Sequence, residues 1–344
     1  MYKKIFSQVR PFIQAIKSEL KRQPLRIGLF VLCVVLLVAI EGYDHFAPVP
    51  AHDWIATNLK KIKVNQPDEL SFAVFGDNKN SFATFEKLLK HVEQDPDMDF
   101  ALDLGDLVYD GEKEKYRYFF NQVRRNLRLP LLTAIGNHEL KENGRGLYYD
   151  IFGPFYYSFQ IGNNYFIVLD DANEIGLDFW QSRWLEEELI KSQHFGTRFI
   201  FMHVPLFDPR GGMYKHCLPE REAHRLALLF KKYHVTHIFA SHIHGYFSGQ
   251  WQGIPYTITG GAGAELYGTD PSHFFYHYLK VQAKDGTATI QVQKLPSPDY
   301  EWLDRLGYIA WLYIYAFIRI HGIEIALFLI AAGSLMLTLR ARKS

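Results

Sequence analysis

Side chains that commonly bind metal ions follow one apolar run after another in the middle of this sequence. They are Asp77, Asp106, Asn137 with His138, His203, and the pair His242 and His244. Each one alone has a simpler explanation, because an Asp after a strand often caps the next helix and a buried His often serves only the core. A whole series of such strand ends is improbable by chance, and mixed nitrogen and oxygen ligands suit Zn, Mn or Fe(II). The pattern therefore predicts a metal centre.

The spacing within this set favours two neighbouring ions. His242 and His244 stand two apart in "SHIH", so both face the same way on an extended segment. Two ions held close together can clamp both oxygens of an in-line displacement. Lys79 does not fit such a site. It stands two positions after Asp77, where a further metal ligand with a lone pair would be expected, but its side chain is a cation.

The elements that must position these residues alternate along the chain between about residues 67 and 295. Apolar runs of strand length are predicted over 70–77, 99–106, 130–139, 197–203 and 236–242. Helical patterns are predicted over 81–94, 113–127, 177–192 and 222–234, and hairpins over 156–170, 250–261 and 275–295. This alternation predicts an α/β fold with a sheet covered by helices on both sides and functional groups at the carboxyl ends of the strands.

Several of these strand ends carry short motifs that resemble those of a known superfamily. The motifs are "GD" at 76–77, "GDLVY" at 105–109, "GNHE" at 136–139, "FMH" at 201–203 and "SHIH" at 241–244. In this order they resemble the calcineurin-like metallophosphoesterase superfamily, and most of all its purple acid phosphatase-like branch. That branch has a metal-binding Tyr three residues after the bridging Asp, as Tyr109 follows Asp106, and lacks the His of the first motif. The resemblance implies a metallophosphoesterase-type β-sandwich flanked by helices.

The resemblance also implies a role for each site residue. One ion would take Asp77, Asp106, Tyr109 and His244, and the other Asp106, Asn137, His203 and His242, with Asp106 as the bridge. Iron is expected in the first site and Zn, Mn or Fe in the second. A metal-bound hydroxide would attack phosphorus, and His138 would protonate the leaving oxygen or hold a phosphate oxygen.

The resemblance does not settle the roles of three further residues near the site. His216 resembles an extra histidine that this branch uses near the substrate, or is a solvated loop residue. Ser241 replaces the Gly usual before the last two histidines, and is expected to crowd the second metal slightly. Lys79 either contacts a substrate phosphate or points to solvent.

Both ends of the chain differ in kind from the middle. Residues 27–40 and 325–339 carry no charge, and their neighbours extend them past Glu41 and Glu324 to the roughly 20 residues that cross a bilayer. The alternatives are a cleaved signal peptide for the first run and a buried core helix for the second. Basic residues precede the first run and follow the second, so the positive-inside rule places both termini in the cytoplasm and the middle outside.

The predicted domain organisation follows from these segments. It comprises a basic amphipathic segment (1–24), a transmembrane helix (25–45), a linker (46–66), the metallophosphoesterase domain (67–295), an interfacial aromatic helix (296–321), a second transmembrane helix (322–339) and a basic tail (340–344).

Composition narrows the function further. The chain has 344 residues and a formal net charge of +1, which provides no electrostatic footprint for nucleic acid. Its two cysteines, Cys33 and Cys217, say little about the compartment. The lack of an N-x-Ser/Thr sequon favours a bacterial protein, and with the two spans we expect it in a bacterial inner membrane. We expect a membrane-anchored dinuclear phosphoesterase acting on a lipid-linked phosphate or diphosphate at the outer leaflet. The alternatives are a phosphatase of soluble phosphomonoesters or nucleotides, and an inactive membrane scaffold.

Overall fold

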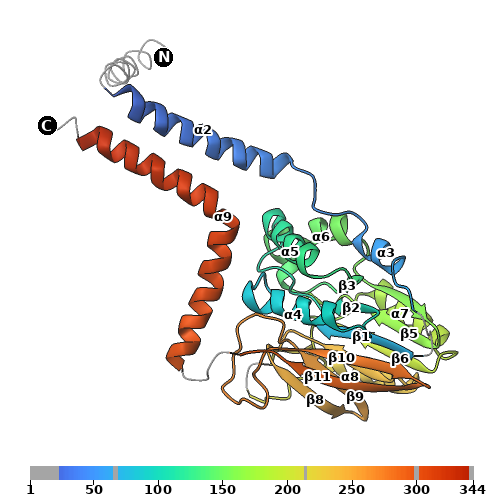
Figure 1. Ribbon diagram of the computed structural model, residues 1–344. Helices are drawn as coiled ribbons and strands as arrows, with labels where there is room; N and C mark the ends of the chain where they lie inside the picture. The colour runs from blue at the N-terminus through green and yellow to red at the C-terminus, as the bar shows by residue number, and fades with distance from the viewer. Residues whose placement is uncertain (1–22, 65–68, 213–214, 298–301, 341–344) are drawn as a thin grey trace. The chain divides into compact units, whose positions relative to one another are not determined.

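The computed structural model describes residues 23–64, 69–212, 215–297 and 302–340 (Figure 1). It divides into two compact units, one running from Val49 to Ala316 and the other formed by the terminal segments on either side. Each unit is described by itself.

The larger unit contains two β-sheets. The first has the order β11-β10-β1-β2-β3 and the second the order β4-β5-β6-β7-β9-β8. The first sheet comprises β1 (Glu69–Phe75), β2 (Phe100–Asp103), β3 (Leu131–Thr133), β10 (His277–Lys284) and β11 (Thr287–Lys294). The second comprises β4 (Tyr157–Ile161), β5 (Asn164–Val168), β6 (Thr197–Phe201), β7 (His237–Ala240), β8 (Tyr246–Trp251) and β9 (Ile254–Thr259). Neighbours β1, β2 and β3 are parallel, as are β5, β6, β7 and β9.

The two sheets pack face to face through aromatic side chains. The ring of Phe72 in β1 lies 5.1 Å from that of Phe100 in β2, and 5.5 and 5.6 Å from Phe166 and Phe199 of the other sheet. All four side chains are fully buried. The sandwich is therefore confirmed, whereas the single sheet predicted from the alternation is wrong. A strand that is buried on both faces is a nearly continuous apolar run, and this pattern is the same whether the strands form one sheet or two.

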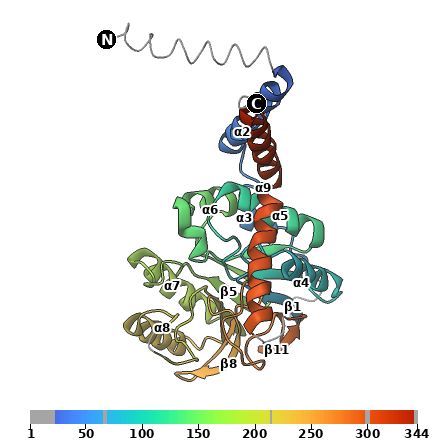
Figure 2. The same cartoon turned by 90° about the vertical axis from the view of Figure 1, so that its left-hand side faces the viewer.

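Helices cover the outer faces of this sandwich. In Figure 2, α4 (Ala83–Gln94) and α5 (Lys113–Asn126) lie on the side of the first sheet, and α7 (Phe179–Ser192) and α8 (Glu220–Lys232) on the side of the second. Shorter helices are α3 (Trp54–Leu59), the 3-10 helix η1 (His138–Asn143) and α6 (Arg145–Phe152). η1 and α6 were not expected from the sequence, because one or two turns are too short to show a clear apolar period.

The other unit consists of long apolar helices. α2 spans Pro24–Phe46. α9 runs from Trp302 to Arg340 with a kink at His321, and its residues from Phe317 onward belong to this unit. Pro24–Asp44 and Leu312–Arg340 are long and apolar enough to cross a membrane. The Ser334 hydroxyl donates to the carbonyl of Arg26 (2.6 Å), so the start of α2 lies beside the end of α9 and the two helices run antiparallel. The expected interfacial helix and second span thus form one bent helix. Of the predicted basic segment 1–24 and the predicted tail 340–344, residues 1–22 and 341–344 lie outside the described residues.

Buried histidines make the larger unit sensitive to acid. Burial lowers the pKa of His277 to about 4 from its usual 6.5, and the charge of Lys294 acts in the same direction. The ring nitrogens of His277 face the Thr259 hydroxyl and the Phe275 carbonyl. The unfolded chain therefore binds a proton first as the pH falls from 6.5 towards 4, and each such group reduces the free energy of unfolding by up to about 1.4 kcal/mol per pH unit. We expect His277→Gln to flatten this pH dependence in denaturant titrations, while His194→Gln, at an exposed position, leaves it unchanged. An identical slope in both variants would contradict this assignment.

Candidate metal centre

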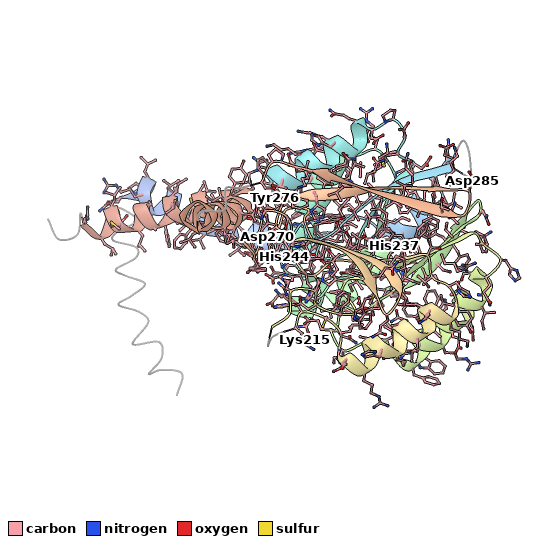
Figure 3. The ribbon with its side chains drawn as sticks, turned by 90° about the horizontal axis from the view of Figure 1, so that it is seen from below. Lys215, His237, His244, Asp270, Tyr276 and Asp285 are labelled. Atoms are coloured by element: carbon pink, nitrogen blue, oxygen red, sulfur yellow. The ribbon has the colours of Figure 1, made fainter. Side chains whose placement is uncertain are left out.

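The expected ligands gather where the carboxyl ends of both sheets meet. Asp77 follows β1, Asp106 follows β2, Asn137 follows β3, His203 follows β6, and His242 and His244 follow β7. His237 is the first residue of β7, and His244 lies beyond the other end of this strand. Figure 3 shows these two histidines well apart, so only His244 belongs to the group at the carboxyl end. Three of the candidates adopt left-handed backbone conformations, with φ of 60° at Asp77, 56° at Asp106 and 66° at His242. Such backbone is costly away from glycine and tends to occur at functional sites.

We call the candidate ligands of the second ion, Asp106, Asn137, His203 and His242, the second-metal group, and those of the first ion the first-metal group. The ligand atoms of the second-metal group lie closer together than those of the first-metal group. Nε2 of His203 lies 3.0 Å from Oδ1 of Asn137 and 3.4 Å from Oδ1 of Asp106, and Nδ1 of His242 lies 3.2 Å from the same Asn137 oxygen. The other ring nitrogen of His203 donates to the carbonyl of Leu104 (2.9 Å), which leaves a lone pair on Nε2. Lone pairs facing one another at this distance fit a shared cation.

The first-metal group is built around Asp77 and His244. Oδ1 of Asp77 lies 3.3 Å from Nε2 of His244, and among the described residues this buried oxygen has no hydrogen-bond donor. Nδ1 of His244 donates to the carbonyl of Glu265 (2.6 Å), so its Nε2 also presents a lone pair. Ligand atoms of Asp77, Asp106 and His203 lie within 4.8 Å of one another. The donor set therefore fits a dinuclear site with Asp106 between the two groups.

Tyr109 stands at the edge of this centre. Its ring packs against that of His138 at 5.6 Å, and its side chain is 41% exposed. Its role as a ligand stays a prediction.

Lys79 does not point to solvent. It is 7% exposed, and its ammonium lies 3.5 Å from Oδ2 of Asp106. Burial alone would raise the pKa of Asp106, but His203, Lys79 and His138 outweigh burial and hold this pKa below its usual value. Lys79 therefore adds a positive charge beside the Asp106 carboxylate.

Three residues whose roles the sequence did not reveal hold the ligands in place. The Glu139 carboxylate accepts from the backbone N–H groups of Gly136 (2.7 Å) and Asp106 (2.8 Å). Asp171 accepts from the N–H of His203 (2.9 Å). Burial raises the pKa of Glu139 and of Asp171 to about 7. Glu139 could have been suspected from "GNHE", whereas nothing local singles out Asp171 from Asp170.

The third of these residues is Ser241. Its hydroxyl donates to Oδ2 of Asp77, which also accepts from the N–H of His242 (2.7 Å). Ser241 therefore supports a candidate ligand of the first ion, and its expected crowding of the second ion stays a prediction. A Cβ on Gly76 would lie 2.3 Å from this hydroxyl, which explains the Gly of "GD".

The two candidate catalytic histidines differ in how they are held. The His138 N–H donates to Oδ1 of Asp106 (3.0 Å), and its Nδ1 lies 2.5 Å from the carbonyl of Tyr109. Burial lowers the pKa of His138, although Asp106 opposes this effect. His216 is exposed, and its ring lies 5.8 Å from that of His242. The structure thus places the exposed His216 beside His242, on the open side of the candidate ligands of the second ion.

A two-sheet sandwich with carboxylates, an amide and imidazoles at its joined strand ends defines a metallophosphoesterase. The family model for calcineurin-like phosphoesterases matches residues 70–246, more than half of the chain. The protein belongs to the calcineurin-like phosphoesterase family.

Similar proteins support the purple acid phosphatase-like branch. The chain is 26% identical over 138 residues to purple acid phosphatase 23 of Arabidopsis thaliana, covering 35% of this chain and 29% of that protein. It is 30% identical over 181 residues to a probable cyclic nucleotide phosphodiesterase of Rhodopseudomonas palustris, covering 48% and 64%. A purple acid phosphatase from yellow lupin seeds shares the fold with a TM-score of 0.54 at 19% identity, over 70% of this chain and 55% of that one. The chain thus spans less than two thirds of the length of these curated relatives.

Proposed function

We propose that this protein is a membrane-anchored, metal-dependent phosphoester hydrolase. The convergence of His203, Asn137 and His242 on one point, with Asp106 between that group and Asp77, carries the proposal. Two bound ions would polarise the phosphoryl group and supply a nucleophile at neutral pH. The chain's own residues orient these ligands, and the buried Lys79 adds positive charge where a phosphate would bind.

His138 is the residue placed to handle the proton. Its backbone is anchored to Asp106, and its Nε2 lies 3.8 Å from Oδ2 of Asp106, at the side of the centre. His138 would therefore protonate the leaving oxygen, or hold a phosphate oxygen, and His216 would contact the substrate from the open side.

The proposed substrate is a lipid-linked phosphate or diphosphate at the outer leaflet. The support is the pair of helices long and apolar enough to span a membrane, with basic residues at their outer ends. The second candidate is a soluble phosphomonoester or nucleotide, which the similarity to a probable cyclic nucleotide phosphodiesterase favours.

A hydrolysis screen of the full-length protein in detergent tests this proposal. Metal-loaded protein should release phosphate from a lipid-linked phosphate or diphosphate more efficiently than from glycerol phosphate or a cyclic nucleotide. Equal turnover of soluble and lipid-linked esters would contradict the proposal that the substrate is lipid-linked. No turnover of any ester, together with no bound metal, would instead indicate an inactive scaffold.

The proposed topology has its own expected result. A reporter fused before Met1 or after Ser344 should read as cytoplasmic. A cysteine introduced at Lys284, an exposed residue at the end of β10, should label from outside intact cells. Labelling of that cysteine only after lysis would contradict both the orientation and the outer-leaflet substrate.

Tyr109 is expected to give the oxidised protein a visible absorption band. A free Tyr has a pKa of about 10, so a bound phenolate at neutral pH requires a strongly Lewis-acidic ion such as Fe(III) beside it. Such a pair absorbs visible light by charge transfer. We expect a visible band in the oxidised protein that Tyr109→Phe abolishes, and that Tyr149→Phe, on the exposed face of α6, leaves intact. A colourless, active protein containing two zinc ions would contradict the assignment.

A further inference from the structure

Three tyrosines from distant parts of the chain meet beside the first-metal group. Tyr109 follows β2, Tyr267 follows β9, and Tyr313 lies in α9 before Phe317, within the larger unit. In Figure 2 this part of α9 runs in front of the α/β unit. The Tyr313 ring lies 5.1 Å from that of Tyr109, and the Tyr267 ring stacks on that of His244 at 4.9 Å. We call Tyr109, Tyr267 and Tyr313 the aromatic arc.

Glu265 holds the arc in place. It is 7% exposed, and its carboxylate accepts hydrogen bonds from the hydroxyls of both Tyr267 and Tyr313. Burial alone would raise the pKa of Glu265, but His244, Lys79 and these hydroxyls hold it below its usual value. Because the backbone carbonyl of Glu265 also accepts from His244, one residue links a candidate metal ligand to α9. With two hydroxyls engaged, ring surface is what the arc offers to a ligand.

This ring surface borders the candidate metal centre on its exposed side. The side chains of Tyr109 and Tyr267 are 41% and 62% exposed, beside an otherwise buried and charged centre. The Tyr109 ring contacts His138, the residue proposed to protonate the leaving oxygen. Aromatic faces favour apolar groups over phosphate. The alcohol side of an ester held at the centre would therefore meet the arc, whatever the Tyr109 hydroxyl binds.

We propose that the aromatic arc binds the apolar chain of an amphiphilic phosphoester and so selects it over short polar esters. This inference rests on the proposed function and adds the residues that determine specificity, with Glu265 as a positioning residue. Tyr313 is the second residue of the candidate span Leu312–Arg340. Tyrosines at the ends of membrane spans lie at the depth of the lipid headgroups, where an amphiphile presents both its phosphate and the start of its chain.

Binding of phosphonates tests the arc without relying on catalysis. The full-length, metal-loaded protein in detergent would be titrated with a long-chain alkyl phosphonate and with methylphosphonate, whose C–P bonds are not esters. Tyr313→Ala should weaken the long-chain ligand about tenfold, and the methyl ligand by less than about twofold. Tyr267→Ala should act in the same direction, and because Tyr267 is exposed this substitution should leave the fold intact. Tyr149→Ala, at an exposed site on α6, serves as the control.

The ratio of two catalytic efficiencies provides the second readout. In Tyr313→Ala, kcat/KM for a long-chain phosphoester should fall about tenfold relative to that for glycerol phosphate, with unchanged metal content. Equal losses for long and short ligands, or no loss for either, would overturn the arc as a specificity element. If the wild type binds the long-chain phosphonate through these tyrosines but hydrolyses no ester, the proposed function fails and the arc is upheld.

Discussion

Asp106→Asn is expected to reduce phosphoester hydrolysis by about a thousandfold and to lower the bound metal to one ion or none, because it removes the charge that two ions would share. The side chain is 1% exposed and lies between His203 (3.4 Å) and Lys79 (3.5 Å). The substitution preserves its shape, so the effect should come from charge and not from packing. Steady-state hydrolysis and metal analysis of purified protein measure both consequences.

The matched control for this substitution is Asp150→Asn, at an exposed position on α6. It makes the same chemical change away from the centre, and should leave activity and metal content within about twofold of the wild type, as surface substitutions generally do. An Asp106→Asn protein that keeps two ions and full activity would show that the centre lies elsewhere.

Asn137→Ala is expected to reduce hydrolysis by about a hundredfold or more, by analogy with loss of one electrostatic group at a catalytic site. Its Oδ1 is the atom on which His203 and His242 converge, at 3.0 and 3.2 Å. Without it the second ion should be lost or bound weakly. The first ion should remain, so the visible band expected from Tyr109 should persist.

Metal analysis and the visible spectrum of the same sample separate these effects. Asn126→Ala, at a partly exposed position on α5, should change neither quantity. Loss of the band together with the second ion would mean that the two groups do not bind independently, and would place Asn137 at the bridge instead.

Much of the α/β unit was predictable because its local signals agree. Most predicted strands and helices of the middle region are present to within a few residues, as in 177–192 against α7, Phe179–Ser192. The strand predicted over 130–139 is shorter, Leu131–Thr133, and β8 begins at Tyr246, before the hairpin predicted over 250–261. α4 shows why, since Phe85, Leu88, Leu89 and Val92 recur at helical spacing and all are buried. The pairing of strands was not predictable, since β1 lies between β2 and β10, a strand more than 200 residues later in the chain.

The sequence by itself determined the kinds of ligand and their order, because each follows its own strand and a parallel strand delivers its last residues to a common edge. Only the tertiary structure decided what surrounds them. Lys79, expected at solvent or substrate, is buried against Asp106, in a turn where Asp77, Lys79 and Asn80 adopt left-handed backbone conformations. Ser241 reaches Asp77 across 164 residues of chain, and Glu265 joins His244 to Tyr313 of α9. Such contacts depend on the packing of distant loops, and no periodicity or local motif encodes the distance between two loops.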